Sequence, residues 1–294
     1  MLTSFIEQSG LPTTFEQTAQ QWFTPLAKRI AEQSRQQQAP FTLGINGCQG
    51  SGKSTLASYL HHYLSEQAEL SVVNLSLDDF YFDQATRQQL AQAVHPMLAT
   101  RGVPGTHDTR LLASTLKQLI KGEQVPLPSF DKARDNPTQP SQWPLSPPRV
   151  DVIIIEGWCW GVGAQNQHQL LKPINTLEST QDDKGVWRNY VNDQLVQYYQ
   201  PLYSLMDKWL MLKAPSFKCV ANWRWQQEQQ LAAQQTLTNT KAMPSKVMNQ
   251  AQVMAFIAYF QRLTEHSLTT LPKACDLVFE LDEHRTITSA IGNI

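Results

Sequence analysis

The sequence has no excess of charge of either sign, no long apolar run and no secretory leader pattern. Its 294 residues contain 24 Lys and Arg against 25 Asp and Glu, so no global field favours nucleic acid or an anionic membrane surface. No segment approaches the ~18 continuous apolar residues of a membrane span, and residues 1–20 lack a basic start followed by an apolar stretch. We therefore expect a cytoplasmic protein with neither a nucleic-acid nor a membrane partner.

Cysteine is also scarce. Cys48, Cys159, Cys219 and Cys275 stand far apart with no C-x-x-C spacing, a pattern that fits neither a zinc site nor a disulfide framework. We interpret them as reduced thiols. A chain of 294 residues can bury a full core without cross-links, either as two domains or as one large α/β unit with insertions.

Short apolar segments alternate with helical or loop sequence along most of the chain. Apolar residues recur near helical spacing over residues 15–38, which predicts a surface helix. The predicted strands lie at residues 41–46, 70–77, 150–155, 209–213 and 277–281. This alternation favours an α/β fold with a mostly parallel sheet and helices on both faces.

Two stretches interrupt the alternation. Residues 126–148 carry seven prolines among many polar residues and predict an extended excursion over the surface, whereas residues 165–188 predict a polar loop insertion. Long loops in a compact domain are often functional.

A glycine-rich loop follows the first predicted strand and precedes a predicted helix at residues 53–67. Residues 47–54 match G-x-x-x-x-G-K-[ST] in full. Glycines are needed because successive N–H groups can then converge on the β- and γ-phosphates of a nucleotide. Lys53 adds a positive charge there, Ser54 offers a hydroxyl ligand to Mg²⁺ and Thr55 can contact the α-phosphate. The predicted ATP-binding residues are Gly47, Cys48, Gln49, Gly50, Ser51, Gly52, Lys53, Ser54 and Thr55.

Carboxylates follow two other predicted strands. Strand 150–155 ends in Glu156, which has the form of a Walker B element and can position Mg²⁺ or its water. A strand that ends in Glu by chance is the alternative. Trp158 and Trp160, which follow, could wall the site or belong to the core.

The second predicted strand is followed by Asp78 and Asp79. A carboxylate there can orient a hydroxyl acceptor and take its proton, and Tyr81 can help to shape the acceptor pocket. Either aspartate could be this base. A helix cap before Phe80 is the alternative role for Asp78.

Together these segments resemble the P-loop kinases that include uridine kinase, phosphoribulokinase and pantothenate kinase, and most closely the D-glycerate 3-kinase-like proteins. The resemblance runs from about Phe41 to the last predicted strand. It is carried by the glycine-rich loop and by residues 76–81 (SLDDFY), 101–108 (RGVPGTHD), 128–132 (PSFDK) and 155–158 (IEGW). It implies a P-loop NTPase fold and an ATP- and Mg²⁺-dependent transfer of phosphate to a hydroxyl of a small metabolite, D-glycerate above all. We predict a single domain over residues 1–294, with a helical extension at 1–40 and insertions near 126–148 and 165–188.

The resemblance also implies roles for particular residues. It favours Asp78 as the catalytic base, and it places a lid arginine on the predicted helix 215–235, at Arg224. A guanidinium there would neutralise charge on the transferred phosphoryl group, whereas a surface arginine stacked on a neighbouring tryptophan is the alternative. Lys53, Asp78 and Arg224 are thus the predicted catalytic residues.

An acidic acceptor needs a cation to pair with its carboxylate. Four residues in or next to the matching segments could supply that charge: Arg101, His107, Lys132 and Arg134. His107 and Asp108 could instead bond each other, and Asp108 could cap the predicted helix 109–121.

Two other functions are less well supported. A GTPase would need an N-K-x-D element, and the nearest string, at residues 239–242, lacks the Asp. A nucleotide-switched adaptor that phosphorylates nothing has no need of a hydroxyl base at Asp78. Among kinases, the acceptor could also be a nucleoside, a pantothenate-like alcohol or a sugar phosphate, and the sequence does not indicate an oligomeric state.

Overall fold

The computed structural model describes residues 2–237 and 248–294, and a six-stranded sheet forms its centre. The strand order is β2-β5-β1-β6-β7-β8. Neighbouring strands from β2 to β7 are parallel, and β8 is antiparallel to β7. The sheet strands are β1 (Phe41–Gly47), β2 (Val72–Ser76), β5 (Val152–Gly157), β6 (Lys208–Lys213), β7 (Leu277–Leu281) and β8 (Ile287–Gly292).

The five predicted strands all lie in this sheet. Every residue of β1 and β5 is buried, because helices cover both faces of a parallel sheet and each strand therefore needs apolar side chains on both sides. The antiparallel edge strand β8 has a weaker apolar pattern and was not predicted. A separate hairpin of β3 (Phe130–Asp131) and β4 (Asn136–Pro137) was not predicted either.

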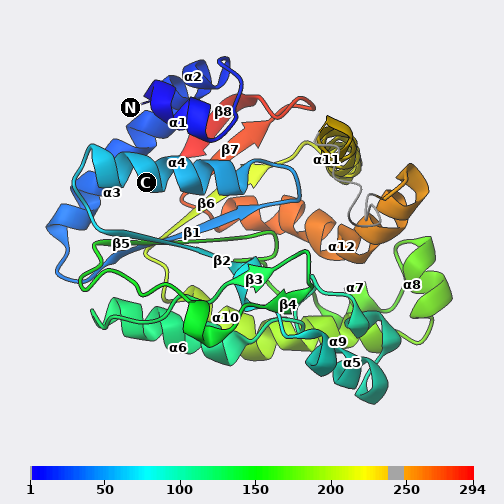
Figure 1. Cartoon of the computed structure of the whole chain (residues 1–294). Coiled ribbons are helices and arrows are strands. Elements are labelled where there is room, and N and C mark those ends of the chain that lie inside the picture. Colours follow the sequence, from blue (N-terminus) through cyan, green and yellow to red (C-terminus); the bar gives the residue numbers. More distant parts are fainter. Residues whose placement is uncertain (1, 238–247) are drawn as a thin grey trace.

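Helices cover both faces of the sheet, with α3 and α4 on one side and α6, α9 and α10 on the other (Figure 1). This confirms the predicted α/β architecture. The α-helices are α1 (Leu2–Gln8), α2 (Phe15–Thr18), α3 (Thr24–Gln36), α4 (Lys53–Glu66), α5 (Gln84–Ala93), α6 (Thr109–Ile120), α7 (Gln167–Leu170), α8 (Thr176–Gln181), α9 (Val186–Gln194), α10 (Gln200–Tyr203), α11 (Phe217–Leu237) and α12 (Gln250–Thr270). Short 3₁₀ and π turns are η1 (Ala19–Phe23), η2 (Leu77–Phe80), η3 (Pro96–Ala99), η4 (Pro140–Gln142), η5 (Leu195–Tyr199) and η6 (Leu271–Lys273).

The helix predicted over residues 15–38 is interrupted by a π turn. Residues 15–36 form α2, η1 and α3 in succession. The π turn η1 comes just before Pro25, and the second π turn, η5, comes just before Pro201. Proline has no amide hydrogen to continue the regular ladder, so a wider turn before it keeps the helix continuous.

The polar loop predicted over residues 165–188 is wrong, because this stretch contains α7, α8 and the start of α9. Two buried arginines hold it in place. Arg262 on α12 pairs with Glu178 and donates to the carbonyls of residues 169 and 172, and Arg188 on α9 pairs with Asp182 and donates to the carbonyl of residue 170. The Arg262 contacts join residues 84 to 93 positions apart, so the local polar composition does not indicate them.

Residues 126–148, by contrast, contain only the β3–β4 hairpin and the short turn η4, in keeping with an extended excursion. Residues 239–242, weighed above for a GTPase element, lie outside the described residues. None of the helices in the described part of the chain combines the length and apolar character needed to cross a bilayer.

Candidate active site

A cleft of about 360 Å³ lies where the carboxyl ends of β1, β2 and β5 meet, the edge of a parallel sheet at which α/β proteins bind ligands. The glycine-rich loop, the β2 end and the β3–β4 hairpin contribute to it, together with α11 and α12. Its lining residues are Gln49, Gly50, Lys53, Ser54, Asp78, Tyr81, Arg101, Lys132, Trp158, Arg224, Gln227, Phe256 and Phe260.

The glycine-rich loop has the backbone that its glycines allow. Gly50 and Gly52 have φ angles of 77° and 92°, a region that other residues rarely adopt. Helix α4 starts at Lys53 directly after the loop, so its free N–H groups are available to an anion. A Cβ on Gly50 would lie 2.9 Å from Cβ of Trp223, so α11 packs tightly against the loop.

Lys53 and Glu156 face each other beneath the loop. Lys53 Nζ lies 3.6 Å from Glu156 Oε2, and the Lys53 side chain is 17% exposed. Burial lowers the pKa of Lys53, but the negative charges of Glu156 and Asp78 outweigh that effect and raise it. Lys53 therefore keeps its positive charge at the point where phosphates of a nucleotide would lie.

The surroundings of Glu156 fit a magnesium ion. Glu156 Oε1 accepts hydrogen bonds from Ser54 Oγ at 2.8 Å and Ser76 Oγ at 3.1 Å, while the buried Oε2 accepts none from the described residues. Hydroxyl and carboxylate oxygens suit Mg²⁺. Nowhere in the described chain do three or more His, Cys, Asp or Glu side chains gather to hold a metal unaided, so a cation here would share its ligands with the phosphates of a nucleotide.

The adjacent aspartates after β2 point to different places. Asp78 lines the cleft, where Oδ1 accepts from Tyr81 Oη at 3.0 Å and Oδ2 from Lys132 Nζ at 2.7 Å. Asp79 instead accepts from the backbone amide of Phe130 at 3.2 Å and so fastens the β3–β4 hairpin. The cap of the turn η2 is the side chain of Ser76, which accepts from the amide of Asp78. The alternative role of Asp78 as a helix cap is therefore wrong.

The two carboxyl groups also differ in acidity. Burial raises the pKa of Asp78, but the positive charges of Lys132 and Lys53 outweigh it and bring the pKa down to about 2. The pKa of Asp79 is raised to about 6, mainly by burial. The hydrogen bond from the Phe130 amide lowers it, and the negative charge of Asp78 raises it by a smaller amount. At neutral pH Asp78 is fully ionised, whereas Asp79 becomes protonated in mildly acidic solution.

Tyr81 and His107 form a stacked pair at the wall of the cleft, with ring centroids 4.3 Å apart. Only Tyr81 lines the cleft. His107 is 1% exposed, and its Nδ1 lies 2.6 Å from Tyr199 Oη. Burial lowers the pKa of His107 to about 3, so the ring is neutral at physiological pH. The expectation that His107 could supply a positive charge to an acceptor is therefore wrong.

The other predicted acceptor contacts separate into two groups. Arg101 and Lys132 line the cleft, whereas Arg134 is 86% exposed and pairs with Asp131 outside it. The side chain of Asp108 accepts from the amide of Leu111 and so caps α6, which confirms the capping role. It makes no pair with His107.

Arg224 projects from α11 into the cleft. It forms an ion pair with Glu228, one turn further along the helix, and its guanidinium lies 5.8 Å from the ring centroid of Phe256 on α12. The alternative, a surface arginine stacked on a neighbouring tryptophan, is wrong. Trp223 is instead buried, and Arg285 lies over its ring.

Several lining residues were not found from the sequence. Gln227, Phe256 and Phe260 reach the cleft from α11 and α12, and the close approach of Phe260 to Gly102 places α12 against the residue 101–108 segment. No sequence motif marks them, because their contribution depends on how α12 packs. Of the two tryptophans after β5, Trp158 lines the cleft and donates to the carbonyl of Gly102, whereas Trp160 is fully buried.

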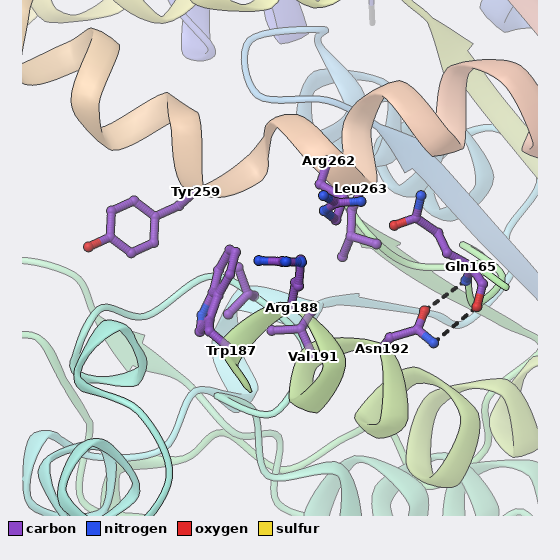
Figure 2. A pocket seen from close by; sticks show the side chains of 9 residues that line it. Gln165, Trp187, Arg188, Val191, Asn192, Tyr259, Arg262 and Leu263 are labelled. Atoms are coloured by element: carbon purple, nitrogen blue, oxygen red, sulfur yellow. Dashed lines mark hydrogen bonds between the residues drawn. The ribbon is translucent and has the colours of Figure 1, made fainter. Parts of the chain in front are cut away.

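A second, smaller cavity lies between α9 and α12 (Figure 2). Its volume of about 10 Å³ is roughly that of one water molecule. Figure 2 shows Arg188 and Arg262 beside it, and both are already paired with buried carboxylates. This cavity belongs to the structural core and has no residue of the glycine-rich loop.

Comparison with known proteins identifies kinases that are similar to this chain over most or part of its length. No family model matches it. A protein of Schizosaccharomyces pombe described as "Uncharacterized kinase mug58" is 32% identical over 283 residues, which cover 88% of this chain and 94% of that protein. The chloroplastic D-glycerate 3-kinase of Arabidopsis thaliana is 28% identical over 199 residues, which cover 64% of this chain and 41% of that protein.

The same fold occurs in a solved structure. The D-glycerate 3-kinase from Cryptococcus neoformans var. grubii superposes with a TM-score of 0.74 at 23% identity, over 95% of this chain and 99% of that one. The arrangement of strands and helices described above is therefore shared over nearly the full length of both chains.

Proposed function

Because the chain belongs to the D-glycerate 3-kinase-like P-loop kinases and is a small-molecule kinase, we propose that it transfers the γ-phosphoryl group of ATP to a hydroxyl of D-glycerate. The observation that carries this proposal is the composition of the cleft. Four cationic side chains and one ionised carboxylate, Asp78, surround it. A phosphoryl donor and an acidic acceptor both need cations, and a hydroxyl acceptor needs a base.

The cations are distributed to serve two ligands. Lys53 lies under the glycine-rich loop and Arg224 faces it from α11, so both would contact the phosphates of ATP. Lys132 in the β3–β4 hairpin pairs with Asp78, and Arg101 lies over Phe130 of the same hairpin, so both would face the acceptor. Mg²⁺, held by Ser54 and Glu156 together with the nucleotide, would neutralise phosphate charge.

In this arrangement Asp78 would orient the acceptor hydroxyl and receive its proton as the oxygen attacks phosphorus. Tyr81 donates to one carboxylate oxygen of Asp78 and thereby restricts its rotation. Trp158, Phe256 and Phe260 give the cleft an apolar wall, which would exclude water from the transferred group and so limit ATP hydrolysis.

A coupled ADP-release screen tests the acceptor. The purified protein would be supplied with ATP and Mg²⁺, and with D-glycerate, L-glycerate, uridine, pantothenate or ribulose 5-phosphate in separate reactions. We expect ADP release to require an acceptor and to be fastest with D-glycerate, with phosphoglycerate as the product. Faster turnover of a nucleoside or a sugar phosphate would overturn the assignment of D-glycerate.

A further inference from the structure

The four cations that line the cleft are not equivalent. Three of them each face a carboxylate that pairs with no other cation in the described part of the chain: Lys53 with Glu156, Lys132 with Asp78 and Arg224 with Glu228. The fourth, Arg101, shares its carboxylate, Asp135, with a second arginine, Arg87. One carboxylate between two guanidinium groups leaves one positive charge unmatched.

That unmatched charge belongs to Arg101 because Arg87 is enclosed. Arg87 is 2% exposed and donates from Nε to the carbonyl of Phe82 at 3.1 Å and from Nη1 to that of Ala99 at 2.7 Å. Its Nη2 contacts Asp135 Oδ2 at 2.7 Å. A buried guanidinium needs a paired carboxylate, so Arg87 takes the charge of Asp135. Arg101, on the cleft side, remains available to an anion.

The position of Asp135 is fixed by the hairpin backbone and by its hydrogen bonds. It lies between β3 and β4 with a φ of 58°, and its Oδ1 accepts from Arg101 Nη1 while Oδ2 accepts from Arg87 and Gln84. Burial raises the pKa of Asp135, but the hydrogen bonds from Arg87, Gln84 and Arg101 outweigh it and hold the pKa below its usual range. The carboxylate is thus ionised at neutral pH.

Arg101 is therefore held along one edge only. Its Nη1 is bound to Asp135, and the ring of Phe130 lies 5.4 Å from the guanidinium carbon. Among the described residues, no other group accepts a hydrogen bond from Arg101. Its remaining N–H donors are free to form a charge-assisted contact with a carboxylate in the cleft.

We propose that the ion pair between buried Arg87 and half-buried Asp135 positions Arg101 to bind the carboxylate of the acceptor, and thereby selects a hydroxy acid over a neutral alcohol. Arg87 and Asp135 are positioning residues, since neither lines the cleft. This inference rests on the proposed function, because it concerns the acceptor side of the same cleft. Arg87 and Asp135 lie outside the segments that carry the family resemblance.

Substitution of Asp135 tests the inference through acceptor preference. In Asp135→Asn the two guanidinium groups lose their shared anion, and we expect Arg101 to leave its position. The KM for D-glycerate should rise about tenfold or more, as expected for loss of a charge-assisted contact, while kcat and the KM for ATP change less than threefold. The ratio of kcat/KM for D-glycerate to that for glycerol should fall by a similar factor.

Asp135→Glu separates position from charge, because it keeps the charge and moves the carboxylate by one methylene. Positioning predicts that this variant also loses preference for the acid. If Asp135 only reduced positive charge, Asp135→Asn would instead lower the KM for D-glycerate and Asp135→Glu would behave as the wild type. Asp83→Asn is the matched control, since Asp83 is an exposed carboxylate that caps the helix carrying Arg87. It should leave the preference unchanged.

The outcomes also separate this inference from the proposed function. A wild-type protein that does not prefer D-glycerate to glycerol would overturn both. A wild-type protein that prefers the acid, together with folded Asp135 variants that keep this preference, would overturn the positioning role alone. Circular dichroism and melting temperature establish which variants are folded, and the Glu variant keeps the test available if the Asn variant is not.

Discussion

Lys132 Nζ lies 2.7 Å from Asp78 Oδ2, so the proposed base is ion-paired with a residue of the β3–β4 hairpin. This pair contributes to the low pKa of Asp78, about 2, and a carboxylate of that pKa is a weak proton acceptor. The side chain of Lys132 is 61% exposed and can leave without disturbing the core. An acidic acceptor that attracts Lys132 would free Asp78 for the hydroxyl, whereas water would not.

Lys132→Met should raise the pKa of Asp78, because burial then acts against fewer positive charges. A base must be deprotonated, so activity is lost as the pH falls through its pKa. The acidic limb of the kcat/KM profile should therefore move to higher pH in Lys132→Met than in the wild type. Measurement of kcat/KM between about pH 4 and 8 checks this. Arg134→Met is the control, because Arg134 lies on the same hairpin outside the cleft, and an equal shift in both variants would contradict the expectation.

Asp78→Asn should lower kcat by roughly 10²–10⁴, because the amide keeps the volume of the side chain but cannot take the proton. The affinity for ATP should barely change. Since Ser76 rather than Asp78 caps η2, no cap is lost, and any fall in melting temperature should reflect only the lost ion pair with Lys132. Steady-state kinetics and thermal melts on the same preparation measure both effects, and a folded variant with wild-type kcat would rule out Asp78 as the base.

Asp79→Asn should be milder in kcat and should change the pH dependence of stability. The pKa of Asp79 is raised to about 6, so the folded state binds this proton more tightly than the unfolded state, and stability falls as the pH rises through roughly 4 to 6. Asparagine does not ionise, so the Asp79→Asn variant does not lose stability in this pH range. The melting temperature of Asp79→Asn relative to the wild type should therefore increase from pH 4 to pH 7, and a constant difference would show that Asp79 has an ordinary pKa.

Glu228→Gln should affect the nucleotide side of the cleft. Glu228 is 2% exposed and pairs with Arg224, and it also accepts from the amide of Met248. Without its charge, Arg224 loses the partner that holds it beside Phe256. We expect kcat to fall and the KM for ATP to rise, each by about tenfold, because charge-assisted contacts of this kind are worth a few kcal/mol. Glu283→Gln, an exposed carboxylate near α11, is the control and should retain wild-type kinetics.

The residues on the proposed nucleotide side of the cleft could all be picked out from the sequence. The glycine-rich loop, with Lys53 and Ser54, follows β1, and Glu156 ends the apolar run of β5. A parallel sheet brings the carboxyl ends of such strands to one edge. Because each of these residues is next to its strand in the chain, local pattern was enough to bring them together. The adjacency of Asp78 and Asp79 to β2 was equally clear, whereas which of them faces the cleft was not.

The proposed acceptor side of the cleft and its apolar wall of Trp158, Phe256 and Phe260 depend on tertiary packing. Histidine can carry a positive charge, but His107 is buried beside Tyr199, and burial lowers its pKa to about 3. Arg101 and Lys132 could not be ranked from the sequence, because their availability depends on their ion-pair partners: among the described residues Lys132 has Asp78 to itself, whereas Arg101 shares Asp135 with Arg87. Those pairings join residues up to 54 positions apart, through packing of the β3–β4 hairpin that no local pattern encodes. The charge that a side chain presents in the cleft depends on its burial and on nearby charged groups, and these are set by the folded structure.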